Sequence, residues 1–460
     1  LTVLAVTVLA LQLNSYSKYR KTFPNGLTVG GINVGGLSED EAEQRISSIY
    51  MLELDLYYQA DRVPLNPVDV EFAVDLETMM NEAVEQRDTS GFWPGFWDFL
   101  LGRQSDSEPI ELEATYSETR LKAVLANISA TRDQEPQPAV PVPTTLAYQE
   151  GEAGHQLDLA ASEPLVAEAL MSPSNRQVTL VVDQISPPAP GLETLGRLID
   201  AHMSDYDGIY AVYVIDLETG ESLGINEDVA FSGLSILKIP IIIETFRTLD
   251  NEPNVEQTKL LTETMVESGN YTANLLLDVI AGEDNGMLGA ERVTDTLWKL
   301  GLTNTFIAVP YEEDIPGTYT TEANQRTDLN THPDPKMQTT PKDMAMLLEM
   351  VYQCAAGGGT LLAAFPDDMR SDECQLMLEM MNQNRIGSLI EAGVPAGTTV
   401  AHKHGWGPET HGDAGIVFSD GGDYILVEYM YKPVWLEWAE SSPLLAEISR
   451  ATYNLFNYSQ

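Results

Sequence analysis

Basic residues are scarce in this sequence. Its 460 residues include 25 Lys and Arg against 70 Asp and Glu, a formal net charge of −45 at pH 7. Such an excess of negative charge repels phosphate backbones and anionic lipid surfaces. We therefore exclude nucleic acid as a partner and expect contact with a membrane only through an N-terminal anchor. The length exceeds what one core usually organises, so two or three domains are expected.

Long apolar runs are also lacking. The first 13 residues, LTVLAVTVLALQL, are apolar but too few for an ordinary membrane span. They fit the core of an export signal or the remnant of a span, with a buried helix as the alternative. Because the sequence does not begin with Met, we expect that its start is truncated. We predict that residues 1–23 form a membrane anchor or signal segment and that the protein lies outside the cytoplasm, in the cell envelope.

The orientation of this segment is left open by the basic residues that follow it. Lys18, Arg20 and Lys21 would face the cytoplasm under the positive-inside rule, against export of the remainder.

Cysteine is nearly absent, and Cys354 and Cys374 are the only two. An exported protein can join them in a disulfide, and two buried free thiols fit the sequence equally well.

The first half of the chain predicts a mixed domain. GLTVGGINVGGLSEDEAEQRI combines alternating apolar residues with glycine pairs, which predicts short strands and then a helix capped by Ser38 and Glu41. EFAVDLETMMNEAVEQ indicates a helix and RQVTLVVDQI a strand. The proline-rich SPPAPGL indicates a hinge. We therefore predict an α+β domain over residues 24–186 and a linker over 187–199.

Residues 200–460 predict one antiparallel sheet flanked by helices. IYAVYVIDLETGESLGINED predicts a hairpin that turns at Thr219 and Gly220, and GDAGIVFSDGGDYILVEYMYK predicts a second one near the end. A terminal helix is expected from near Trp435. Helical segments lie between the two hairpins, so the predicted fold class is α+β, an α/β sandwich.

The segment FSGLSILKIP places a serine three positions before a lysine, Ser235 and Lys238. On a helix these two side chains can touch. A lysine amine can take the proton of a serine hydroxyl when burial or nearby cations lower its pKa. Alone, the pair fits a helix cap beside a surface lysine equally well.

Two further motifs follow in a fixed order, S-x-N in MVESGNYTANLLLDVI and K-x-G in TTVAHKHGWGPETHGDAG. The ordered set S-x-x-K, S-x-N and K-x-G resembles that of class A β-lactamases and penicillin-binding proteins. The resemblance spans about residues 200–456 and includes TANLLL and TTPKDM. It implies a serine hydrolase that forms an acyl-enzyme with β-lactams or related peptidoglycan peptides. The alternative is a non-enzymatic cell-wall-binding or scaffold protein that keeps the β-lactamase fold.

The resemblance also implies a role for each motif residue. Ser235 would attack the carbonyl carbon, Lys238 would help to remove the serine proton, and Ser268 would pass a proton to the leaving nitrogen. The oxyanion would lie between the backbone N–H groups of Ser235 and Trp406. The residues implied in substrate binding are Asn270 for the side-chain amide, with Lys403, His404 and Gly405 of the third motif on the side of the substrate carboxylate.

Three positions depart from the family's pattern: Gly269 stands where Asp is usual, His404 where Thr or Ser is usual, and Arg326 where the deacylating glutamate of class A enzymes is expected. An imidazole can still donate to a carboxylate, with a strength that depends on pH. A guanidinium cannot take a proton from water, so we expect slow deacylation. The substitutes considered for the missing carboxylate are Asp328 and Glu322.

A metal site is the competing interpretation of the third motif. His402, His404, His411 and Asp413 lie within 12 residues, and an H-x-H pair on a strand points both rings to one face. The K-x-G motif accounts for the same segment, and no other segment is rich in histidine. We therefore expect no metal and no cofactor.

The first domain carries a resemblance of its own. TVGGINVGGLSEDEA and EGEAGHQLDL, in which Gly151, Gly154 and Leu157 fall at the family's positions, resemble the peptidoglycan-binding domain of vancomycin-resistance W-type proteins. The resemblance covers about residues 24–186 and implies cell-wall glycan as a partner. The alternative is a spacer that holds the second domain away from the membrane.

Overall fold

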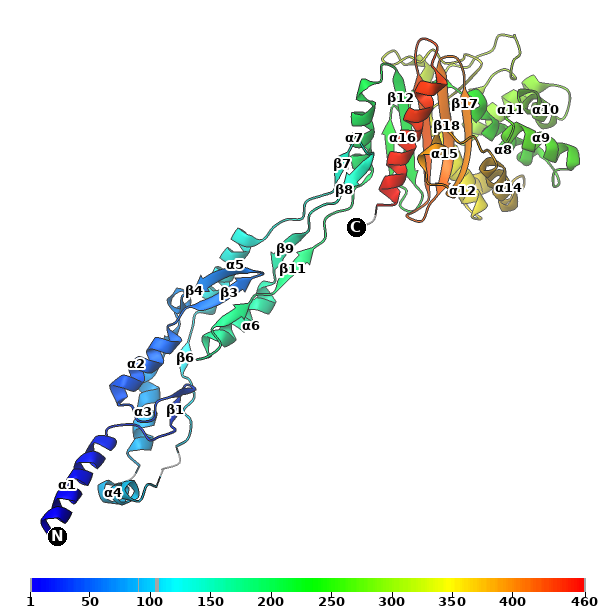
Figure 1. The fold of residues 1–460 in the computed structure, drawn as a ribbon. Helices are drawn as coiled ribbons and strands as arrows, with labels where there is room; N and C mark the ends of the chain where they lie inside the picture. The colour runs from blue at the N-terminus through cyan, green and yellow to red at the C-terminus, as the bar shows by residue number, and fades with distance from the viewer. Residues whose placement is uncertain (1, 90, 104–106, 459–460) are drawn as a thin grey trace. The chain divides into compact units, whose positions relative to one another are not determined.

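The computed structural model describes residues 2–89, 91–103 and 107–458. Helices and strands are mixed throughout, as the α+β prediction requires (Figure 1). The chain forms two compact units, Leu1–Gln137 with Glu152–Pro187, and Pro138–Gly151 with Pro188–Gln460. Each unit has its own buried core.

This division differs from the predicted boundaries of 24–186 and 187–199 in two places. Residues 138–151 belong to the second unit, where they form a hairpin of β7 (Val140–Val142) and β8 (Ala147–Gln149). The expected linker contains most of helix α7 (Leu192–His202), whose Leu195 and Leu198 are fully buried. The apolar side of this helix is part of a core, so the segment is not a free hinge.

The first unit is built from short strands and amphipathic helices. Its helices are α1 (Thr2–Tyr19), α2 (Glu39–Tyr50), α3 (Leu76–Arg87), α4 (Phe92–Leu100), α5 (Glu118–Arg132) and α6 (Leu159–Leu170). Its strands are β1 (Thr28–Val29), β2 (Ile32–Asn33), β3 (Leu54–Tyr58), β4 (Asp61–Leu65), β5 (Ala73–Val74), β6 (Ala114–Thr115), β9 (Gly154–Leu157), β10 (Gln177–Thr179) and β11 (Val182–Ile185).

Several local predictions for this unit are confirmed. Ser38 and Glu41 form the capping box at the start of α2. The segment expected as a helix, residues 71–86, is helical from Leu76 as α3, while its first part contains β5. RQVTLVVDQI, expected as one strand, supplies two, β10 and β11, which pair with β3 and β9. Within the part of the chain that the structure describes, no helix has the length and apolar character that a bilayer span requires.

The second unit is organised by a five-stranded antiparallel sheet in the order β13-β12-β19-β18-β17. Its strands are β12 (Ile209–Asp216), β13 (Ser222–Ile225), β17 (Thr399–Trp406), β18 (Thr410–Phe418) and β19 (Tyr424–Tyr431). Both predicted hairpins are confirmed, β12 with β13 and β18 with β19. Because successive side chains alternate between faces, the sheet has an apolar surface on each side.

Helices cover both faces of this sheet (Figure 1). On one face, α7 and the terminal helix α16 (Trp438–Phe456) pack against Val214 and Leu426. On the other, α12 (Pro341–Ala355) packs against Ala414 and Val427. Helix α16 begins three residues later than expected from Trp435, because the Leu436 backbone N–H donates to the carbonyl of Pro408 instead.

Further helices pack beyond α12, and two of them begin at the first two motifs. They are α8 (Lys238–Thr248), α9 (Val255–Met265), α10 (Asn270–Ala281), α11 (Gly286–Lys299), α13 (Gly359–Ala364) and α14 (Ser371–Asn382). The short helix α15 (Ile390–Gly393) packs against α16 instead. A disulfide joins Cys354 of α12 to Cys374 of α14. The question that the sequence left open is thus decided in favour of the bonded pair.

Candidate active site

Ser235 and Lys238 are neighbours at the start of α8. Ser235 lies in a 3-10 turn, Leu234–Leu237, and Lys238 is the first residue of the helix. Positions three apart eclipse one another in a 3-10 turn. The Lys238 Nζ atom is accordingly 2.8 Å from the Ser235 Oγ atom, and the lysine side chain is fully buried.

The other partners of Lys238 favour a neutral amine. Its Nζ atom is 2.8 Å from the carbonyl oxygen of Ser268 and 2.7 Å from the Oδ1 atom of Asn270, and both of these oxygens only accept hydrogen bonds. Together they can take both N–H bonds of an uncharged amine. The lone pair of that amine is then free to accept the Ser235 hydroxyl proton.

The electrostatic surroundings of Lys238 also favour its neutral amine. Burial, with a smaller contribution from the charge of Lys403, lowers the pKa of Lys238 to about 7, while the carboxylate of Glu312 opposes the change. Lys403 is itself fully buried, and burial lowers its pKa to about 8 against the effect of Asp413. An amine with a pKa near neutrality can serve as a general base.

These surroundings predict a pH dependence of acylation. The base form of Lys238 is the deprotonated one, so the rate of acylation should rise as pH increases through about 7 and level off above it. Stopped-flow acylation rates across about pH 5 to 9 would measure the midpoint. Since Glu312 raises the pKa of Lys238, Glu312→Gln should move that midpoint downward. A rate independent of pH over this range would contradict the assignment of Lys238.

The second motif lies at the start of α10. Ser268 has a left-handed backbone, with φ 59°, and its Oγ atom is 3.3 Å from Lys238 Nζ. A Cβ atom at Gly269 would come within 2.5 Å of the Thr272 hydroxyl oxygen. Thr272 therefore occupies the space that an Asp side chain would need at this position, which explains why glycine stands there instead of the usual Asp.

The third motif lies on strand β17, beside the 3-10 turn of Ser235. A Cβ atom at Gly405 would meet the Leu234 side chain at 2.6 Å and the Ser235 backbone nitrogen at 2.9 Å. Glycine is thus needed for the close approach of strand and turn. The approach brings the backbone of β17 next to the Ser235 N–H group, where an oxyanion would be held.

A cavity of about 690 Å³ opens at these motifs. Its lining includes Ser235, Ser268 and Asn270 from the first two motifs, His404, Gly405 and Trp406 from the third, and residues 383–386 after α14. Six of the eight residues predicted for the site line this cavity, and a seventh, Lys238, contacts Ser235, Ser268 and Asn270. The buried Lys403 lies behind the lining, so it acts on the site through its charge.

The sequence model of the beta-lactamase enzyme family matches residues 194–253 and 248–456. The chain belongs to the beta-lactamase enzyme family. No curated protein matches it in sequence.

Several solved structures are similar to this family member. One is PBP-A, at 21% identity and a TM-score of 0.45, covering 59% of this chain and 99% of that chain. Another is a beta-lactamase from Sphaerobacter thermophilus DSM 20745, at 17% identity and a TM-score of 0.45, covering 59% and 99%. A third is a beta lactamase from Xanthomonas campestris pv. campestris, at 20% identity and a TM-score of 0.44, covering 58% and 98%.

One carboxylate at the site of this β-lactamase-family domain was missed by the sequence prediction. The Asn270 Nδ2 atom donates to the Oε1 atom of Glu312 at 2.8 Å, while the Oδ1 atom of the same amide faces Lys238. Glu312 follows Val309–Pro310–Tyr311 in a loop without regular structure. The adjacent acidic pair of Glu312 and Glu313 was the only signal in the sequence, and a pair of this kind is common on surfaces.

The backbone that carries Glu312 is held firmly. The Asn274 side chain bonds both the N–H and the C=O of Tyr311, each at 2.9 Å. The buried Tyr311 ring lies 4.7 Å from Lys238 Nζ, and its hydroxyl donates to the carbonyl of Leu234. Glu312 itself has φ 63°, an unusual conformation for a side chain larger than glycine. Its carboxylate is thus fixed beside the Ser-Lys pair.

Arg326 lies elsewhere, which corrects the expectation drawn from the loop that contains it. Its guanidinium pairs with Asp328, 2.6 Å from Nη2 to Oδ2, and it lines a separate cavity together with Glu322. None of these three side chains lines the cavity at Ser235. Glu312 does not line that cavity either: it lines a third cavity and reaches the motifs through its bond to Asn270.

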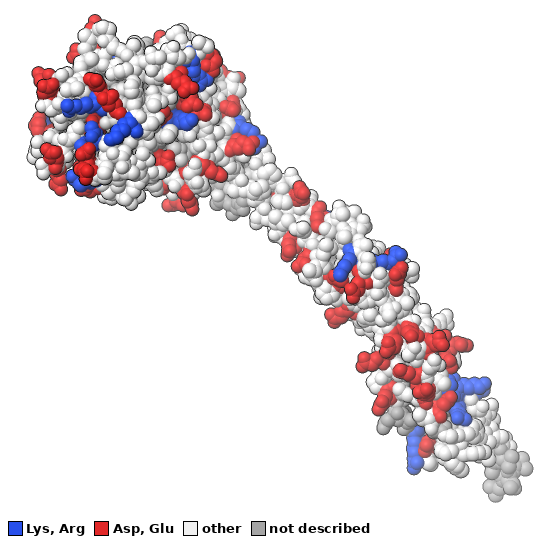
Figure 2. All heavy atoms as spheres, turned by 180° about the vertical axis from the view of Figure 1, so that it is seen from behind, with Lys and Arg blue, Asp and Glu red and all other residues white. Residues whose placement is uncertain are grey.

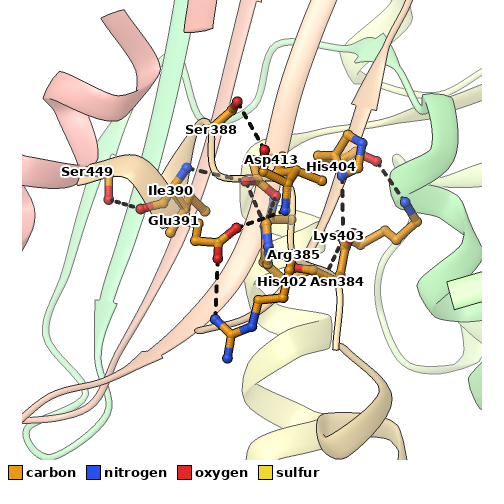
Figure 3. Close-up of polar contacts among 12 residues, drawn as sticks. Asn384, Arg385, Ser388, Ile390, Glu391, His402, Lys403, His404, Asp413 and Ser449 are labelled. Carbon is orange, nitrogen blue, oxygen red and sulfur yellow. Dashed lines mark hydrogen bonds and ion pairs between the residues drawn. The ribbon is translucent and has the colours of Figure 1, made fainter. Parts of the chain in front are cut away.

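His404 is held in one tautomer by Asn384 (Figure 3). The Asn384 Nδ2 atom donates to the carbonyl of His402 at 3.1 Å and lies 3.4 Å from the Nδ1 atom of His404. Burial and the charge of Lys403 lower the pKa of His404 to about 4. The ring is therefore neutral near pH 7 with its proton on Nε2, so the expected pH dependence of its donor strength falls outside the physiological range.

The other residues of the proposed metal site have structural partners (Figure 3). His402 Nδ1 is 2.8 Å from Asp413 Oδ2, and His402 Nε2 is 2.7 Å from the carbonyl oxygen of Asn384. Burial lowers the pKa of His402, but the Asp413 carboxylate outweighs it and the pKa is raised. His411 contacts Ser441. Among the described residues no group of three or more ligands is arranged to hold a metal.

Glu428 predicts a further pH dependence, that of stability. It lies opposite Asp413 across β18 and β19, fully buried, and neither carboxylate oxygen has a partner among the described residues. Burial, with Asp413, raises its pKa well above the usual value. A raised folded-state pKa means that stability is present at low pH and is lost as pH rises.

Glu428→Gln should therefore raise the free energy of unfolding at about pH 8 by about 1 to 3 kcal/mol and change it less at about pH 5. Thermal unfolding at both pH values measures the difference. The exposed Glu218→Gln is the matched control and should show no such change. An equal effect of Glu428→Gln at both pH values would show that its ionisation does not affect stability.

Proposed function

We propose that this protein is a serine hydrolase of the β-lactamase type that forms an acyl-enzyme on Ser235 with β-lactams or related peptidoglycan peptides. The observation that carries the proposal is the buried Lys238 amine, 2.8 Å from the serine hydroxyl and with a pKa lowered to about 7. A serine is a weak nucleophile until a base of this kind activates it.

The proposed first half-reaction uses the contacts of Lys238 in sequence. Ser235 Oγ attacks the amide carbonyl while Lys238 takes its proton. The backbone N–H groups of Ser235 and Trp406 hold the oxyanion. Lys238 is 3.3 Å from Ser268 Oγ, so the proton can pass through Ser268 to the leaving nitrogen as the C–N bond breaks. The product is an ester on Ser235 and a free amine.

Glu312 is the proposed base of the second half-reaction. A water that attacks the ester must lose a proton, and a carboxylate can accept it. Glu312 is bound to the same Asn270 amide that contacts Lys238, and its charge raises the pKa of Lys238. With Glu312 as the base, deacylation would not be slow, contrary to the expectation drawn from Arg326.

Intact-mass spectrometry after incubation with penicillin tests the proposal. We expect one acyl group per chain, located on Ser235, and none after Ser235→Ala. Ser222→Ala on the exposed strand β13 is the control and should still be labelled. Absence of any adduct on the wild-type protein, together with no hydrolysis of penicillin, would favour the scaffold alternative, since fast deacylation would clear the adduct but consume penicillin.

The extracytoplasmic location is part of the same proposal. The Cys354–Cys374 disulfide supports it, because such bonds persist mainly in oxidising compartments. Binding of cell-wall glycan by the first unit stays a prediction.

A further inference from the structure

Helix α4 carries almost only apolar side chains. Its sequence is FWPGFWDFL, with Asp98 as the single charged residue. One side of the helix packs against α1, where the Tyr16 ring lies 5.3, 5.4 and 5.5 Å from the rings of Phe92, Phe96 and Phe99. Phe96 is buried by this contact. The inner side of α4 thus has a partner within the first unit.

The outer side of α4 has no such cover. Trp93, Trp97 and Leu101 are four positions apart and therefore form one stripe along the helix. Their exposed fractions are 61%, 60% and 62%. A helix that is apolar all round normally lies in a core or in lipid. The indole rings of Trp93 and Trp97 are exposed to water on adjacent turns of α4. We therefore expect that a partner outside the described chain covers them.

Helix α1 extends this apolar surface. It packs on α4 and exposes Val8, Leu9 and Leu11 by 50%, 48% and 61%. We call the most exposed apolar residues of α1, of α4 and of the C-cap of α4, which are Val8, Leu9, Leu11, Trp93, Trp97 and Leu101, the α1/α4 surface. Its extent exceeds the single exposed apolar side chains that soluble domains commonly show.

Basic residues border this surface. Lys18, Arg20 and Lys21 lie at the end of α1 in a stretch, residues 16–24, that contains no acidic residue. The Arg20 guanidinium is 5.7 Å from the Phe92 ring. Figure 2 shows blue side chains gathered where the first unit carries the N-terminal helix. Basic residues thus gather here although the net charge of the chain is −45.

One of these basic residues, Arg20, also lines a pocket of a size suited to an anionic group. A cavity of about 270 Å³ is lined by Arg20, Arg87 and Arg103 together with the rings of Tyr16, Tyr19 and Phe99. Asp98 also lines it and pairs with Arg103 at 3.5 Å. Arg20 has no ion pair with any described residue and is free to bind a phosphate. Guanidinium groups bind phosphate well because they offer paired donors.

We propose that the α1/α4 surface docks on an anionic lipid bilayer, with its tryptophans at the level of the headgroups and its basic residues against lipid phosphates. Tryptophan beside Lys and Arg is the pattern of helices that lie in a membrane interface. A glycan would also stack on tryptophan, but it offers no acyl region for Val8, Leu9 and Leu11. The proposal is independent of the hydrolase activity and adds α4 to the anchor expected at residues 1–23.

Vesicle flotation of the full chain tests the proposal. Vesicles of phosphatidylcholine are compared with vesicles that also contain phosphatidylglycerol. We expect binding to the anionic vesicles, and a loss of at least about 10-fold in affinity for the double variant W93S/W97S, since two buried indoles are removed. Trp435→Ser, which removes an equally exposed indole from the second unit, is the control and should bind as the wild type does.

A second variant tests the proposal without changing α4, in case W93S/W97S does not fold. K18Q/R20Q/K21Q leaves the apolar residues in place and should abolish the preference for phosphatidylglycerol. Penicillin labelling of Ser235 reports separately on the second unit. Wild-type binding by W93S/W97S would overturn the proposal, because α1 alone would then account for docking. Equal binding to neutral vesicles, or binding only to cell-wall glycan, would also overturn it.

Discussion

Replacement of Lys238 by methionine should slow acylation of Ser235 by about 10²- to 10⁴-fold, the effect of losing a general base. Methionine keeps most of the buried volume of the lysine stem but offers no lone pair of sufficient basicity to the hydroxyl. Four oxygen partners of Nζ, one on Ser235, two on Ser268 and one on Asn270, would lose their contact at the same time. The measurement is the rate at which the penicillin adduct forms.

The control for this variant is Lys342→Met. Lys342 lies in α12 at another cavity and pairs with Asp228, so its loss should leave acylation unchanged. Both variants need the same unfolding midpoint as the wild type to within a few degrees, which circular dichroism can establish. Acylation of the Lys238 variant at the wild-type rate would mean that the lysine only supports the structure.

Glu312→Gln should separate the two half-reactions. The amide keeps an acceptor for Asn270 but cannot take a proton from water. We expect acylation within a few-fold of the wild-type rate, and loss of the acyl adduct slowed by about 10²- to 10⁴-fold. Intact-mass spectrometry at intervals after removal of free penicillin gives the decay rate directly.

Arg326→Gln is the matched comparison, because it distinguishes the two assignments of the carboxylate position. Since Arg326 pairs with Asp328 and lines a different cavity, its replacement should leave the decay of the adduct unchanged. Faster decay in this variant would restore the assignment made from the sequence. An adduct that is equally long-lived in the wild type and in Glu312→Gln would show that Glu312 does not act on water.

Local patterns in the sequence were sufficient for much of the fold. The two hairpins have alternating apolar residues and tight turns, and the capping box at Ser38 needs only residues close in the chain. The three catalytic motifs were recognised in the same way, from short spacings in a fixed order. Their convergence around Lys238 follows from the fold, in which α8, α10 and β17 meet at one cavity.

Features that depend on distant parts of the chain were not predictable. Glu312 reaches Asn270 through an irregular loop whose path is set by Asn274 and by the buried Tyr311 ring. No periodicity marks such a loop, so the sequence placed the position of the carboxylate at Arg326 instead. The neutral state of His404 likewise depends on burial and on the charge of Lys403, and its tautomer depends on Asn384, which lies 20 positions earlier in the chain.

The hairpin of β7 and β8 limits how this protein can be divided. Leu146 is buried in the core of the second unit, and the Asn454 side chain near the end of the chain donates to its carbonyl. A gene fragment that starts at residue 188 would encode all three catalytic motifs and still lack this piece of the core. The hydrolase unit is therefore discontinuous in the gene. Recombination that exchanges the first unit must carry residues 138–151 along, so the two halves are inherited together.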